Sequence, residues 1–76
     1  MTHEENDIMR DMYFFLRDHT LPPTNDLNAL LVFWQNTAAD IENLVGVKWR
    51  NHSLAIEIGI ALYSYLERQA KAGATA

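Results

Sequence analysis

The stretch LAIEIGIALYSYLER, residues 54–68, decides how this chain folds. On a helix at 100° per residue its apolar side chains form two groups on opposite flanks, Leu54, Ile58, Ala61, Leu62 and Tyr65 on one and Ile56, Gly59, Ile60 and Tyr63 on the other. The apolar arc spans roughly 260°, far wider than the stripe of about 100° with which a helix faces a single core. Such a helix must be covered on both flanks, by its own chain, by a second copy or by a partner protein.

Length and cysteine content limit the protein class. The chain has 76 residues and no cysteine. We therefore expect a single domain, residues 1–76, that buries about 60–65% of its unfolded surface and has modest stability. Without cysteine, disulfides, thiolate metal sites and cysteine catalysis are excluded, which is typical of a cytoplasmic protein. The polar N-terminus does not resemble a secretory signal and no apolar run is long enough to span a membrane, so we expect a soluble protein.

Charge is distributed unevenly along this acidic chain. Its net charge is −4, but residues 1–45 hold eight acids and two bases, whereas residues 46–76 hold two acids and four bases. The acidic part argues against non-specific binding to nucleic acid or to anionic lipid. A surface with two such poles also favours contact between two copies of the chain.

Three helices are predicted, at about residues 3–18, 25–45 and 53–71. Thr2 and Glu5 form a capping-box pattern at the start of the first helix. Thr24 or Asn25 is the expected cap of the second helix, and Gly46 its expected end.

Asn51 or Ser53 is expected to cap the third helix, and residues 73–76 are expected to form a disordered tail. Short connections between neighbouring helices favour antiparallel packing. The predicted fold is therefore an all-α, up-down-up three-helix bundle with a very apolar third helix. Completion of this bundle by dimerisation stays open at this stage.

Catalytic and metal-binding patterns are weak. His3, His19 and His52 lie in three different segments, without the partner spacing of a helical metal site. The carboxylate pairs Asp7 with Asp11 and Asp40 with Glu42 are read as solvated surface, where nothing raises a carboxyl pKa for acid–base catalysis. We therefore predict no metal, no cofactor and no enzymatic activity.

The most distinctive local cluster is Lys48-Trp49-Arg50, followed by Asn51 and His52. Basic residues around an aromatic ring can bind a phosphate backbone while the ring stacks on a base. The competing interpretation is that Trp49 packs against the end of the core while Lys48 and Arg50 remain in water. A helix-turn-helix is not indicated, because residues 54–66 offer almost no side chains that read bases.

These patterns favour a non-enzymatic protein–protein interaction module with a regulatory, adaptor or inhibitor role. Its predicted dimer or partner face consists of Ile56, Gly59, Ile60 and Tyr63, and the simplest cover for that flank is a second copy of this chain packed about a two-fold axis. We therefore expect a homodimer, with a compact monomer or a different protein partner as the alternatives. A second candidate contact is the exposed Phe14 with the acidic residues Asp7, Asp11 and Asp18. The alternative function is a nucleic-acid accessory protein that uses Lys48, Trp49 and Arg50.

Overall fold

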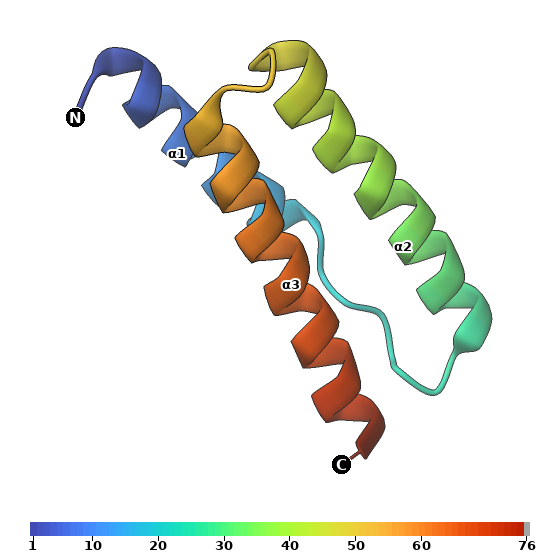
Figure 1. Cartoon of the computed structure of the whole chain (residues 1–76). Coiled ribbons are helices and arrows are strands. Elements are labelled where there is room, and N and C mark those ends of the chain that lie inside the picture. Colours follow the sequence, from blue (N-terminus) through green and yellow to red (C-terminus); the bar gives the residue numbers. More distant parts are fainter. Residues whose placement is uncertain (76) are drawn as a thin grey trace.

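The computed structural model describes the backbone of residues 1–75 and the side chains of residues 1–73. Over these residues the chain is all-helical, with α1 (His3–Asp18), α2 (Leu27–Glu42), a π-helical turn η1 (Asn43–Lys48) that continues α2, and α3 (Ser53–Thr75). In Figure 1, α2 runs back against the direction of α1 and α3, and α1 packs behind the first half of α3. The molecule is elongated, with extents of 41 × 21 × 17 Å.

The first helix begins where the capping box places it. The Thr2 Oγ1 accepts a hydrogen bond from the Glu5 backbone N–H at 3.1 Å, and the Glu5 carboxylate accepts one from the Thr2 N–H at 2.8 Å. These bonds satisfy two amides that the helix itself leaves unpaired. They lower the pKa of Glu5 below its ordinary value of 4.5, chiefly through the backbone N–H of Thr2 and then through its hydroxyl.

The second helix starts later than the sequence suggests. Its cap is Asp26, whose Oδ1 accepts a hydrogen bond from the Ala29 N–H at 3.0 Å, so neither Thr24 nor Asn25 caps it. A turn precedes the cap, in which the Asp26 N–H donates to the Pro23 carbonyl at 3.1 Å. Because this turn uses the residues just before Asp26, the helix cannot begin at residue 25.

The prediction that Gly46 ends the second helix is wrong. Gly46 lies inside η1 and does not have a positive φ angle. The wide π-helical turn closes when the Trp49 N–H donates to the Leu44 carbonyl at 3.1 Å, five residues back. The chain then reverses at Arg50 and Asn51, whose φ angles are 51° and 59°. Asparagine tolerates this left-handed conformation better than arginine, so Arg50 is held there by the surrounding turn.

The third helix begins at the predicted residue but with a different cap. His52 precedes Ser53, and its ring Nδ1 accepts a hydrogen bond from the Leu54 N–H at 3.1 Å. The ring nitrogen of His52 thus serves in place of the side chains of Asn51 and Ser53.

α3 continues past residue 71, where the sequence places its end, to Thr75. Gly73 packs against Thr24, since a Cβ atom at Gly73 would lie 2.9 Å from the Thr24 Cγ2. The loop before α2 therefore holds the end of α3 by close contact. The predicted disordered tail, residues 73–76, therefore overlaps α3 at residues 73–75, and its last residue lies outside the described residues.

The core is built along one line of small and apolar residues on α3. Ala55 and Leu66 are 0% and 4% exposed, and Gly59 between them is also buried. Ile8 and Met12 of α1 pack against Ala55. The structure shows the reason for the wide apolar arc: α1 packs on α3 at Ala55, and α2 and η1 pack on it at Gly59.

Candidate protein-interaction surface

A groove of about 660 Å³ lies between the end of α2, η1 and the first two-thirds of α3. All four residues of the predicted partner face line it, together with residues from the opposite wall. The lining residues are Ala38, Ile41, Glu42, Val45, Gly46, Asn51, Ile56, Gly59, Ile60, Tyr63, Ser64 and Glu67. The flank that the sequence marks for a partner is therefore partly covered by the chain itself and partly open.

Gly59 forms the part of the groove where the two walls come closest. A Cβ atom at this position would lie 3.1 Å from the Val45 Cγ2 and 3.5 Å from two side-chain carbons of Ile41. The distance to Val45 is tighter than ordinary van der Waals contact, so η1 approaches α3 this closely because residue 59 has no side chain. Further along α3, Tyr63 is covered by Trp34, with ring centroids 5.4 Å apart.

Beyond this contact the apolar surface is open to solvent. Ile60 is 62% exposed, while Ile56 and Tyr63 are half-buried. On α2, Leu31 lies two turns before the groove-lining Ala38, which places both residues on the same face of that helix.

Leu27 lies one turn before Leu31, and these two leucines are 78% and 59% exposed. We call the set Leu27, Leu31, Ile56, Ile60 and Tyr63 the groove face. It combines two exposed leucines of α2 with three residues of α3 that line the groove.

Few charged residues line the groove. Glu42 and Glu67 are its ionisable carboxylates, and Asn51 and Ser64 supply neutral polar groups. The groove therefore combines a mainly apolar lining with two acidic groups, a composition compatible with binding to protein.

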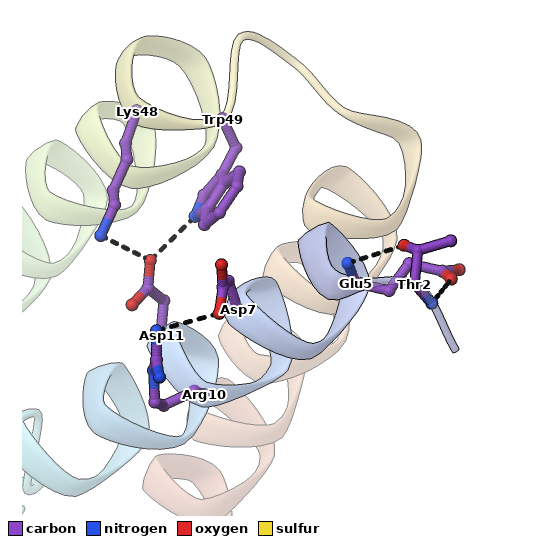
Figure 2. Close-up of polar contacts among 7 residues, drawn as sticks. All are labelled: Thr2, Glu5, Asp7, Arg10, Asp11, Lys48 and Trp49. Carbon is purple, nitrogen blue, oxygen red and sulfur yellow. Dashed lines mark hydrogen bonds and ion pairs between the residues drawn. The ribbon is translucent and has the colours of Figure 1, made fainter.

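The cluster Lys48-Trp49-Arg50 is tied to α1 (Figure 2). The Trp49 indole Nε1–H donates to the Asp11 Oδ2 at 3.0 Å, and the Lys48 ammonium lies 2.7 Å from the same oxygen. Trp49 also packs against the core. Two of the three residues proposed to contact nucleic acid, Lys48 and Trp49, are therefore engaged within the chain, and the third, Arg50, is exposed.

The residues of the second candidate contact, Phe14 and three aspartates, also interact with other residues of the same chain. Asp11 binds the cluster described above and its side chain is only 16% exposed. Asp7 pairs with Arg10 at 3.0 Å, as Figure 2 shows, and Asp18 pairs with Arg17 at 3.0 Å.

The Arg17 guanidinium lies over the Phe14 ring, 4.6 Å from its centroid. Phe14 is 39% exposed, less than the neighbouring Tyr13. Helix α1 therefore presents paired charges and a partly covered ring where the sequence suggested an open acidic surface.

Two histidines make contacts between helices that the sequence did not reveal. The ring nitrogens of His19 lie 2.7 Å from the Phe15 carbonyl oxygen and 2.8 Å from the Asp40 Oδ2. His52 lies 2.9 Å from Glu4 through its other nitrogen. These contacts link α1 to α2 and to the start of α3.

Within residues 1–75 no helix has the length and apolarity to cross a membrane. The described part of the chain also lacks any group of three or more metal-ligating side chains that could hold an ion. No protein-family model matches the chain, and the searches of curated proteins and of solved structures likewise return no significant match.

Proposed function

We propose that this protein is a non-enzymatic protein–protein interaction module whose binding surface is the groove face. The observation that carries the proposal is the exposure of apolar side chains on α2 and α3 beside an apolar groove, with Ile60, which lines that groove, 62% exposed. The partner would contribute the apolar stripe of a helix, because the groove runs along two helices and has a mainly apolar lining. In this proposal the three helices form an up-down-up bundle that a further protein surface completes.

The exposed area is large enough to support binding. The exposed fractions of Leu27, Leu31 and Ile60 are 78%, 59% and 62%. Together they correspond to about two whole aliphatic side chains, which would contribute about 3–6 kcal/mol when covered. Apolar atoms of the partner would contribute a similar amount. This gain is comparable with the association cost of about 4–15 kcal/mol, so these three side chains support only weak binding by themselves, which suits a role in reversible regulation or as an adaptor.

The groove is poorly suited to catalysis, which supports the non-enzymatic part of the proposal. Its ionisable carboxylates, Glu42 and Glu67, lie in an open groove beside apolar side chains, without a histidine or a cation among the lining residues. General acid–base catalysis needs a positioned group of suitable pKa beside the reacting atoms. We further propose a cytoplasmic location, which is consistent with a chain that has no cysteine.

The test is affinity capture from an extract of the native host, with the tagged protein and two variants as baits. Ile60→Glu places a charge in the groove face. Val32→Glu is the matched control, because Val32 is 54% exposed, β-branched and on a helix, but does not line the groove. We expect proteins, copies of this chain included, that are retained by the wild type and by Val32→Glu but lost with Ile60→Glu. Equal retention by all three baits would refute the assignment of this surface.

A further inference from the structure

We infer that the occupant of the groove face is a second copy of this chain, with the two α3 helices packed antiparallel about a two-fold axis. This inference rests on the proposed function, in which the groove face binds protein. It names the partner and the orientation, which that proposal leaves open. Three observations support it: the surface area of the single chain, the shape of the groove and the position of the charges at its ends.

The single chain exposes more surface than a monomer of its size normally does. Its accessible surface is 5339 Å² for a mass of 8.7 kDa. A compact monomer of this mass exposes about 4,700 Å². The radius of gyration, 13.3 Å, likewise exceeds the value of about 11.4 Å for a compact chain of this length. The excess area approaches the roughly 800 Å² that each partner buries in a standard interface.

The groove face has the two parts that a self-complementary surface needs. Ile60 lines the groove with 62% of its surface exposed, and the same groove is lined by Ile41, Val45 and Tyr63. A two-fold axis that crosses α3 near Gly59 would place Ile60 of each copy in the groove of the other. Symmetric dimers use the same patch on both subunits, so one chain must carry both the projection and the hollow. This chain carries both.

Charge selects the antiparallel orientation. Asn51 lines the groove near the start of α3 and Glu67 lines it further along that helix. Arg50 is exposed and directly precedes Asn51. Antiparallel packing brings Glu67 of one copy toward Arg50 of the other, whereas parallel packing brings the two Glu67 carboxylates together. Opposite charges favour the first arrangement and like charges disfavour the second.

The partner is tested by light scattering over a range of concentrations. We expect the molar mass to rise from 8.7 kDa toward twice that value for the wild type and for Val32→Glu. The Ile60→Glu variant should remain monomeric, with circular dichroism confirming that it is folded. A wild-type chain that is monomeric up to millimolar concentration would overturn the second copy as partner. The proposed function would then still be judged by the dependence of host capture on Ile60.

The orientation is tested by thiol cross-linking, since the chain has no cysteine of its own. Arg50→Cys and Glu67→Cys are prepared separately, one with an isotope label, and mixed with a short bis-maleimide reagent. Antiparallel packing predicts that the mixed cross-link exceeds either self cross-link, and that Ile60→Glu in the same chains abolishes it. A dominant self cross-link of Glu67→Cys would overturn the antiparallel arrangement.

Discussion

Replacing Asp11 should destabilise the fold much more than replacing any ordinary surface carboxylate. The Asp11 Oδ2 accepts the indole N–H of Trp49 at 3.0 Å and lies 2.7 Å from the ammonium of Lys48 (Figure 2). Through these two contacts a single side chain on α1 holds the end of η1, 38 residues away along the sequence. Asp11→Ala removes both contacts at once.

The magnitude follows from the burial of the two partners. Loss of Asp11 leaves the partly buried indole N–H of Trp49 without a partner, which costs about 1–3 kcal/mol. The Lys48 side chain is 59% exposed, so its ion pair contributes only about 0–1 kcal/mol. The expected loss in the free energy of unfolding is therefore about 1–3 kcal/mol, most of it from Trp49. For a domain of this size that loss lowers the melting temperature by several degrees.

Asp7→Ala is the matched control for this experiment. Asp7 lies one turn earlier on α1 and pairs only with the exposed Arg10, so its replacement changes helix propensity equally but leaves the Trp49 contact intact. Urea unfolding followed by circular dichroism gives the difference between the two variants. Asp11→Asn, which keeps an acceptor for Trp49, should retain most of the stability. Equal stability of Asp11→Ala and Asp7→Ala would refute the role assigned to the Trp49 hydrogen bond.

Two further predictions concern the capping box and the buried core. The pKa of Glu5 is lowered in the folded chain, so its carboxylate adds stability above its ordinary pKa of 4.5, and this contribution is lost as the pH falls through the folded value. Melting temperatures from pH 7 to pH 3 should therefore fall more steeply for the wild type than for Glu5→Gln, and parallel curves would contradict this. Thr37 is fully buried and its Oγ1 has no hydrogen-bond partner among the described residues, so Thr37→Val should raise the free energy of unfolding by about 1–2 kcal/mol. A less stable valine variant in urea unfolding would show that the hydroxyl is in fact satisfied.

Local features of this protein could be predicted from its sequence because they depend on neighbouring residues. The bounds of α1 follow from the capping box of Thr2 and Glu5, whose bonds span three residues. The all-helical fold follows from apolar spacing in the three segments. The need for cover on both flanks of α3 follows from the width of its apolar arc, which is a property of one helix alone. The competing interpretation of Trp49, as a packing residue, is the one seen in the structure.

Tertiary packing decided the features that depend on residues far apart in the sequence. The contact of Asp11 with Trp49 and that of His19 with Asp40 have no signal in local spacing, because 38 and 21 residues separate the partners. Asp26 caps α2 in place of Thr24 or Asn25 because a turn occupies the residues just before Asp26. Capping propensity alone does not distinguish these three candidates.

The groove is likewise a property of two helices. Four of its six α3 residues could be identified by periodicity, but the opposite wall depends on how closely α2 approaches Gly59. Periodicity shows which side of a helix is apolar, but not which neighbour covers it or how much remains exposed. Those outcomes depend on the relative placement of whole helices, which is set by contacts between them.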